Sequence, residues 1–316
     1  MTDFEPRNLL LFGATGTIGI HILQAVLAAR DQFHRVAVFT SPATAAAKKD
    51  LLESWKETKR LEVLVGDLQD EDAVQKAYEG IDTVISALGR GAIALQIPLI
   101  RLADASPTVT WFFPSEYGTD IKYSPASAHE RPHQQKLKVR HYLENQVSNL
   151  AHTYVVTGPY ADMYIRCAAG RDAGGWDVST RTATLLGEDG KGRVSLTTMT
   201  DVGTLVVAAL QHPAVAFNHA LRVNSFTTTP AEIHAEFVRQ TGGQPWNDVQ
   251  YVSLPQLRER ERVAWETDNP TATVFTLRRI WTEGGTLYEN RDNEQIGEPP
   301  MQTLAEVIAS EIKQSP

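Results

Sequence analysis

The sequence predicts an α/β fold with a doubly wound parallel sheet. Short apolar runs alternate with amphipathic stretches through the first half of the chain, as expected for parallel strands joined by helices. A glycine triplet directly follows the first apolar run and opens a helical pattern. The 316 residues are enough for this unit and a second, smaller domain with its own core.

The first half contains six apolar runs that we expect to be strands. They are Asn8–Phe12, Arg35–Thr40, Leu61–Val65, Thr83–Leu88, Thr110–Phe113 and His152–Thr157. Helical patterns separate them, at Thr17–Arg30, Ala45–Trp55, Asp70–Tyr78, Leu95–Asp104 and His133–Gln146. Right-handed crossovers then bring the carboxyl ends of all six strands to one edge of the sheet.

The second half lacks this rhythm. Short strands are expected at Arg181–Leu186, Arg193–Thr197 and Leu221–Ser225, and a helix at Asp201–Gln211 with Thr200 or Asp201 as its cap. Thr229-Pro230 marks a further helix start. We therefore expect a nucleotide-binding domain over residues 1–157 and a smaller α/β substrate-binding domain over 158–316. Segments at about 196–225 are expected to return to the main sheet.

The glycine triplet Gly13, Gly16 and Gly19 predicts a dinucleotide site. One glycine makes the tight turn, one lets backbone approach a pyrophosphate, and one lets the helix pack on the strand. The backbone of Thr15, Thr17 and Ile18 would lie against the phosphates, at the positive end of the helix dipole. The alternative is an ordinary glycine-rich turn between a strand and a helix.

The end of the second strand favours NADP(H), with NAD(H) as the other possible cofactor. It reads Thr40-Ser41 and carries no carboxylate to hold a ribose 2′-hydroxyl. Lys48 is either a partner for a 2′-phosphate or a solvated lysine. Asp67, after the third strand, is expected to meet the adenine amino group or to cap the next helix.

Two more strand ends are expected to contribute to the cofactor site. The fourth strand ends in Ser86, Ala87, Leu88 and Gly89, small or apolar residues that let a dinucleotide pass close to the backbone. Ser115 follows the fifth strand and is expected to bond the cofactor or substrate, or to cap a turn. No tyrosine has a lysine four residues later, which counts against the usual Y-x-x-x-K proton donor of short-chain reductases.

Composition narrows the function classes. The formal charge of −8 gives no global bias toward nucleic acid or anionic membranes, and no apolar run is long enough to span a bilayer. The N-terminus lacks the pattern of a signal peptide, so the expected location is the cytoplasm. With one cysteine and no paired ligand motif, no metal site is expected. His133 is interpreted as a surface histidine, with a helper proton donor as the alternative.

Several motifs together resemble one family. They are the G-x-x-G-x-x-G opening, the run Phe112-Phe113-Pro114-Ser115-Glu116-Tyr117-Gly118, and a lysine on the long helix that follows. In these features the chain resembles the isoflavone reductase-like, or NmrA-like, branch of atypical short-chain dehydrogenases, most of all its fungal members. The arginine that many relatives place after the second strand is Ser41 here.

The resemblance implies an NADPH-dependent reductase of an aromatic, phenolic or conjugated small molecule, in secondary metabolism. It assigns Lys136 to the nicotinamide ribose and to proton transfer. Aromatic and other large side chains are expected to line the substrate pocket: Tyr117, Tyr160, Met163, Tyr164 and Trp176. Two alternatives stay open, namely a redox-sensing regulator that binds the dinucleotide without turnover and a non-redox catalyst on the same fold. The sequence does not indicate an oligomeric state.

Overall fold

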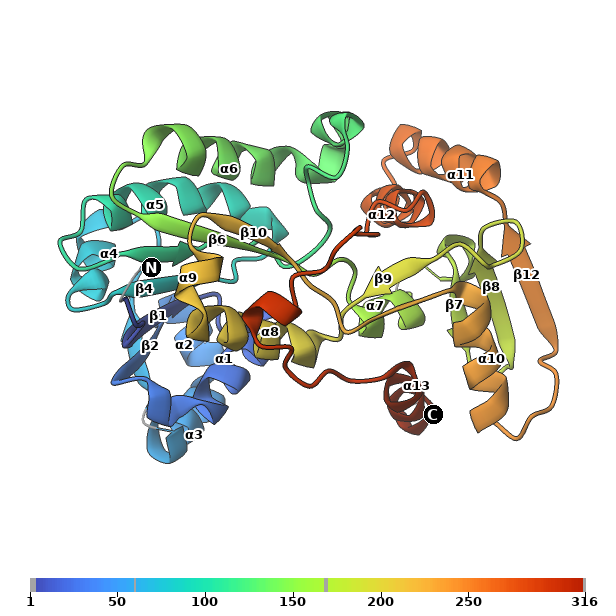
Figure 1. Cartoon of the computed structure of the whole chain (residues 1–316), viewed down its shortest axis with the longest axis horizontal. Coiled ribbons are helices and arrows are strands. Elements are labelled where there is room, and N and C mark those ends of the chain that lie inside the picture. The colour runs from blue at the N-terminus through green and yellow to red at the C-terminus, as the bar shows by residue number, and fades with distance from the viewer. Residues whose placement is uncertain (1–3, 60, 168–169, 315–316) are drawn as a thin grey trace.

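The strands of the chain form three sheets in a computed structural model that describes residues 4–59, 61–167 and 170–314 (Figure 1). The strands are β1 (Asn8–Phe12), β2 (Arg35–Thr40), β3 (Glu62–Val65), β4 (Thr83–Ser86), β5 (Trp111–Phe113), β6 (Ala151–Val156), β7 (Gly175–Asp177), β8 (Thr182–Leu186), β9 (Val194–Leu196), β10 (His219–Arg222), β11 (Phe226–Thr228) and β12 (Asp248–Val252).

The helices divide into two groups. Those of the larger lobe, around the seven-stranded sheet, are α1 (Gly19–Ala28), α2 (Pro42–Ala47), α3 (Lys49–Lys59), α4 (Glu71–Tyr78), α5 (Gln96–Asp104), α6 (Gln134–Gln146), α8 (Met199–Gln211) and α9 (Pro213–Ala216). Those of the second lobe are α7 (Ala161–Arg166), α10 (Pro230–Gln240), α11 (Leu254–Glu266), α12 (Ala272–Thr282) and α13 (Leu304–Gln314).

The central sheet has seven strands in the order β10-β6-β5-β4-β1-β2-β3, and every pair is parallel. Its order reverses beside β1, because β2 and β3 lie on one side and β4 to β6 on the other. The expected doubly wound parallel sheet is thus confirmed, and the six strands of the first half lie where the apolar runs predict them. Ligands bind at the carboxyl edge of such a switch point.

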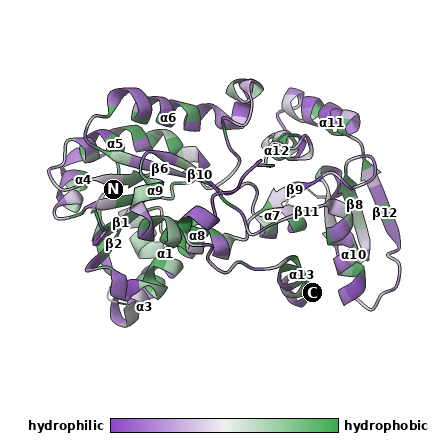
Figure 2. Cartoon of the chain, in the orientation of Figure 1, coloured by the Kyte–Doolittle hydropathy of each residue, from purple (hydrophilic) through white to green (hydrophobic). Residues whose placement is uncertain are grey.

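Successive residues of β1 bury themselves on opposite faces of this sheet. Leu9 and Leu11 join a core with α1 and α8, whereas Leu10 and Phe12 join a core with α4, α5 and α6. Figure 2 shows the result: α1 is largely hydrophobic, whereas α11, which has solvent on one side, is largely hydrophilic. Both faces of the sheet are covered, as a parallel sheet requires.

The second lobe has its own small sheets. β12, β8 and β7 form a three-stranded sheet, and β11 pairs with β9. Its core includes Ile165, Leu185, Ile233 and Phe237. The expected capping at Thr229 is present as a full capping box with Glu232.

Two expected elements of the second half differ from the structure. The last strand of the central sheet is β10, two to three residues earlier than Leu221–Ser225, because its partner β6 ends at Val156 and fixes the pairing. α8 starts at Met199 and is capped by Thr198, not by Thr200 or Asp201. The Thr198 hydroxyl accepts a hydrogen bond from the Asp201 N–H at 3.0 Å, which is the usual N-cap geometry.

Candidate active site

The glycine turn after β1 is built by two contacts that exclude side chains. Gly13 has a φ of +73°, and a Cβ there would lie 2.6 Å from the Ala87 carbonyl oxygen. A Cβ on Gly19 would lie 2.0 Å from the Gly13 carbonyl oxygen. Gly13 therefore allows the turn to touch the end of β4, and Gly19 allows α1 to pack against that turn.

The middle of the turn is open to a ligand. Gly16 and Thr17 are exposed, whereas the Ile18 side chain is buried in the core below the sheet. Ile18 is the N-cap residue of α1, and no side chain caps this helix. The N–H groups of Ile20 and Ile22 already donate to the Gly16 and Ile18 carbonyls. The N–H groups just before them, at Thr17, Ile18 and Gly19, are the ones that can bind an anionic group. Ile18 can contribute to this only through its backbone.

A cavity of about 140 Å³ lies between this turn and the end of β2. Its lining residues are Gly13, Ala14, Thr15, Val38, Phe39, Thr40, Ser41, Thr44, Leu68 and Leu88. None of these described lining residues is a carboxylate. Ser41 also caps α2, because its hydroxyl accepts a hydrogen bond from the Thr44 N–H at 3.1 Å. The cavity thus brings together five of the expected cofactor residues, with hydroxyls at the end of β2.

Two expected cofactor residues lie apart from this cavity lining. Lys48 is exposed at the far end of α2, where it is the C-cap residue. Asp67 is also exposed, and its carboxylate accepts a hydrogen bond from the Gln69 N–H at 2.9 Å. The alternative role of Asp67 as a helix cap is wrong, because Asp70 caps α4. The Asp67 carboxylate is therefore engaged in a local turn with the Gln69 N–H.

The end of β4 lies directly beside the cavity. The Ser86 side chain is fully buried, and its hydroxyl has no partner among the described atoms. Ser115 donates from its hydroxyl to the Leu88 carbonyl at 2.9 Å, and its N–H donates to the Gln96 side chain at 2.7 Å. Ser115 therefore ties two loops together. A Cβ on Gly89 would meet no atom within 4 Å, so the space beside it is open.

Lys136 lies in the first turn of α6 and reaches back to the end of β5. Its ammonium donates a hydrogen bond to the Glu116 carbonyl, and its side chain is partly buried. Lys138, two residues further on, is exposed and lies on a different face of the helix. The bond to Glu116 holds the Lys136 ammonium at the carboxyl edge of the central sheet.

A buried ion pair fixes the loop that carries this carbonyl. Arg140, one turn after Lys136, donates two hydrogen bonds to the Glu116 carboxylate, at 3.0 and 3.2 Å. Both side chains are at most 3% exposed. Arg140 also lies over the Tyr154 ring, 4.3 Å from its centre. Because the Glu116 carboxylate is committed to Arg140, its carbonyl is held in place for Lys136.

The surroundings of Lys136 favour proton exchange. Burial lowers the pKa of the Lys136 ammonium; the Glu116 carboxylate opposes this shift, while the charges of Arg90 and Arg140 add to it. A lysine with a lowered pKa gives up and regains its proton more readily near neutral pH. Lys136 thus has the chemistry of an acid–base group.

His133 is buried, so the interpretation as a surface histidine is wrong. It is 2% exposed, and its Nδ1 lies 3.2 Å from the Ser127 carbonyl oxygen. The Nε2 atom is buried without a partner among the described atoms. Burial is the main cause that lowers the pKa of His133, so the ring favours its neutral form. The packing of the segment before α6 against the second lobe produces this burial.

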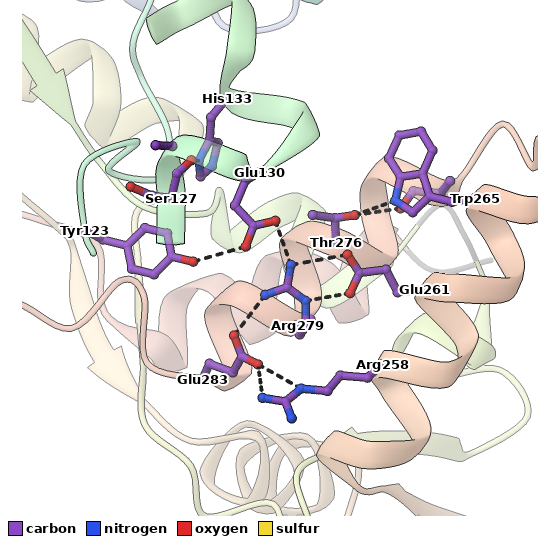
Figure 3. Close-up of polar contacts among 12 residues, drawn as sticks. Tyr123, Ser127, Glu130, His133, Arg258, Glu261, Trp265, Thr276, Arg279 and Glu283 are labelled. Atoms are coloured by element: carbon purple, nitrogen blue, oxygen red, sulfur yellow. Dashed lines mark hydrogen bonds and ion pairs between the residues drawn. The ribbon is translucent and has the colours of Figure 1, made fainter. Parts of the chain in front are cut away.

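An ion-pair network joins that segment to the second lobe (Figure 3). Arg279 of α12 donates hydrogen bonds to Glu130 at 2.7 Å, Glu261 at 2.5 Å and Glu283 at 2.9 Å. Glu130 lies three residues before His133, and its carbonyl accepts from the His133 N–H. The start of α6, and with it Lys136, is therefore held by contacts with α11 and α12.

The five residues expected to line the substrate pocket separate into different places. The Tyr160 hydroxyl donates to the Tyr117 carbonyl, next to the Glu116 carbonyl that holds Lys136. Tyr117 is 3% exposed and its ring packs in the core below the sheet. Met163, in contrast, is 52% exposed. Of these three residues, Tyr160 is the one whose hydroxyl bonds the carbonyl next in sequence to the carbonyl that holds the Lys136 ammonium.

Tyr164 and Trp176 belong to the core of the second lobe. Tyr164 is 3% exposed, and the Arg278 guanidinium lies 4.1 Å from its ring centre. Trp176 stacks on Phe237, with 6.1 Å between ring centres. Packing accounts for the Tyr164 side chain, whereas Trp176 is partly buried and also lines a cavity of about 300 Å³ in the second lobe.

Sequence reasoning missed Glu116, Arg140 and Arg90 as functional residues. Glu116 and Arg140 carry a recognisable signal, since the first lies in the Phe112–Gly118 run and the second is four residues from Lys136 on the same helix face. Arg90 follows the small residues at the end of β4, and only the structure relates its charge to Lys136.

The described residues contain neither a cluster of metal ligands nor a membrane-spanning helix. No group of three or more His, Cys, Asp or Glu side chains there could hold a metal ion. None of the helices in the described ranges combines the length and apolar character needed to cross a membrane.

The fold and this site define a dinucleotide-binding reductase of the atypical short-chain type. The NmrA-like family model matches residues 5–266, and the chain belongs to this family. The expected class, an isoflavone reductase-like oxidoreductase, is confirmed by relatives that are named as reductases and oxidoreductases.

Three relatives show how far the similarity extends. The oxidoreductase aprR of Aspergillus flavus is 32% identical over 97% of this chain and 99% of its own length. Isoflavone reductase of Pisum sativum is 29% identical over 90% of each chain. A phenylcoumaran benzylic ether reductase of Pinus taeda is 31% identical, and the chain spans 65% of its length.

Solved structures of similar proteins share the fold over nearly the whole chain. An isoflavone reductase structure has a TM-score of 0.80 at 24% identity and covers 97% of this chain and 99% of its own. The complex of leucoanthocyanidin reductase from Vitis vinifera with NADPH also has a TM-score of 0.80, at 20% identity, and covers 97% and 100%.

Proposed function

We propose that the protein transfers hydride from NADPH to an aromatic, phenolic or conjugated small molecule. The observation that carries this proposal is the position of Lys136, an amine with a lowered pKa at the carboxyl edge of β5, the strand next to β4. Relatives named for isoflavone, phenylcoumaran and leucoanthocyanidin substrates support the substrate class and a role in secondary metabolism.

The residues present fit NADP(H). The uncapped start of α1 suits the pyrophosphate, and the cavity lined by Thr40, Ser41 and Thr44 offers hydroxyls and no carboxylate near the position of a 2′-phosphate. The buried Ser86 hydroxyl and the open space at Gly89 suit the part of the cofactor that leads to the nicotinamide.

In the proposed reaction NADPH supplies the hydride when it is bound. Lys136 holds the proton that the reduced product takes up, and the Glu116 carbonyl keeps its ammonium pointed to the sheet edge. Tyr160, which precedes α7 of the second lobe, orients the substrate. The Arg140–Glu116 pair acts through Lys136 as a positioning element.

The test combines binding and turnover. NADPH and NADH are titrated into the purified protein, and phenolic and enone compounds are then followed at the nicotinamide absorbance. Lys136→Ala should lower turnover by about 10²-fold or more and leave the fold intact. The matched control is Lys138→Ala on the same helix, which should retain full activity.

The pH profile adds a second readout. A lysine that donates a proton loses this ability as pH rises through its pKa, and the pKa of Lys136 lies below the ordinary 10.5. Turnover should therefore fall on the alkaline side before pH 10.5 is reached. Tight NADPH binding without reduction of any compound, and so without NADPH oxidation, would instead overturn the reductase and favour a sensor of the dinucleotide.

A further inference from the structure

Arg90 stands at the edge of the site with open space around it. It begins the 3-10 helix Arg90–Leu95, directly after the loop that follows β4, and this helix packs against α6. The residue as a whole is exposed, although burial lowers the pKa of its guanidinium, and a Cβ on Gly89 or Gly91 would meet no atom within 4 Å. In the described part of the chain, no carboxylate forms an ion pair or hydrogen bond with Arg90.

Arg90 shares this neighbourhood with two other hydrogen-bond donors. Its charge acts electrostatically on both the Lys136 ammonium and the Tyr160 hydroxyl. Those two groups are bonded to the adjacent carbonyls of Glu116 and Tyr117. A guanidinium, an ammonium and a phenol therefore lie within electrostatic reach of one another near the ends of β4 and β5, where the 3-10 helix of Arg90 packs on α6.

The positive charges of Arg90 and Lys136 are not balanced by a carboxylate within the described part of the site. Glu116 is the carboxylate that acts on Lys136, and both of its oxygens already accept hydrogen bonds from Arg140. Two cations remain at an open edge, with no carboxylate left over among the described residues around them. A bound anion would supply the missing negative charge.

The cofactor phosphates are poorly placed to be that anion. The glycine turn follows β1 and the hydroxyl-lined cavity lies at β2, whereas Lys136 and Tyr160 stand at β5 and β6. β4 separates these two regions in the sheet order. Lys136 and Tyr160, the two groups on which the Arg90 charge acts, therefore lie on the side of β4 away from the glycine turn.

We propose that Arg90 binds a carboxylate group carried by the aromatic substrate. The planar guanidinium can form two parallel hydrogen bonds to a carboxylate, and Lys136 then stays available for the proton. This inference rests on the proposed function and narrows its substrate class to aromatic acids.

The experiment measures binding without turnover. Calorimetry compares benzoate, cinnamate and 3-phenylpropanoate with their methyl esters, using protein saturated with NADP⁺. At least one acid should bind about tenfold or more tightly than its ester, as expected for hydrogen bonds between charged groups. Arg90→Gln should abolish this preference, and Arg90→Lys should retain part of it. Arg101→Gln, an exposed arginine on α5, is the matched control and should keep it.

Three results would overturn the inference. They are equal affinity for acid and ester in every pair, a preference that survives Arg90→Gln, and a loss of NADP⁺ affinity in Arg90→Gln, which would assign Arg90 to the cofactor. A preference that disappears in Arg90→Gln supports it even when no compound is reduced. Failure of the reductase proposal would show separately, as the absence of NADPH oxidation with every compound of the turnover assay, and the carboxylate site would still stand.

Discussion

The two halves of the candidate site are built in different ways. The half at β1 and β2 is made by backbone, since Gly13 and Gly19 permit close approaches and the uncapped start of α1 offers N–H groups. The half at β5 and α6 is made by side chains that meet across long stretches of sequence, such as Glu116 with Arg140. The first half tolerates no added atoms at Gly13 and Gly19, whereas the second depends on charges that balance one another.

The largest effect is expected from breaking the charge balance. Arg140→Met leaves the Glu116 carboxylate buried without its partner, which should lower the free energy of unfolding by about 3–5 kcal/mol. Denaturant titration checks this value. The double variant Glu116→Gln with Arg140→Met should recover part of the loss. A cost below about 1 kcal/mol would contradict the view that this pair fixes the loop.

A change in the backbone-built half should act on the cofactor and leave the fold intact. Gly16 is exposed, and a Cβ there would lie 3.2 Å from the Gly13 carbonyl oxygen. Gly16→Val should weaken NADPH binding by about 100-fold, because the branched side chain occupies the phosphate position. Fluorescence titration measures the affinity. Gly192→Val, at a second exposed glycine with open space, should leave the affinity unchanged.

The choice between cofactors offers a smaller effect. Ser41→Asp keeps a helix cap on α2 but places a carboxylate at the cavity. The affinity for NADPH relative to NADH should fall by about tenfold, because the carboxylate repels a 2′-phosphate. Ser41→Asn, which caps without a charge, separates this repulsion from the loss of the hydroxyl. An unchanged ratio in Ser41→Asp would place the 2′-phosphate elsewhere.

The smallest effect on cofactor binding or turnover is expected at the contact between lobes. Arg279→Gln removes the cation shared by Glu130, Glu261 and Glu283, at a cost of about 1–3 kcal/mol in unfolding free energy. Turnover should fall severalfold while NADPH affinity stays constant, since Glu130 precedes the helix of Lys136. Arg262→Gln, whose partners on α11 are exposed, should change neither quantity. Equal behaviour of the two variants would remove the network from any role at the site.

Much of the fold could be predicted from local patterns. Buried parallel strands are continuous apolar runs, and the turn after the first strand needs the backbone freedom of Gly13 whatever packs around it. Lys136 could be proposed from a motif. The burial of His133 could not, because it depends on Glu130 meeting Arg279, 149 residues away. The same holds for Tyr164 and Trp176, whose aromatic character suits a pocket and a core equally well.

The return of the chain to the central sheet has a consequence for engineering. β10 pairs with β6, and a Cβ on Gly203 of α8 would lie 2.4 Å from the His21 carbonyl oxygen, so α8 fits closely on α1. A chimaera that exchanges everything after residue 157 would strip α1 of its cover and leave β6 as an open edge. A workable graft would keep residues 198–222 native, because they hold α8 and β10, and would replace the segments on either side. A change of substrate specificity would then require two separate replacements.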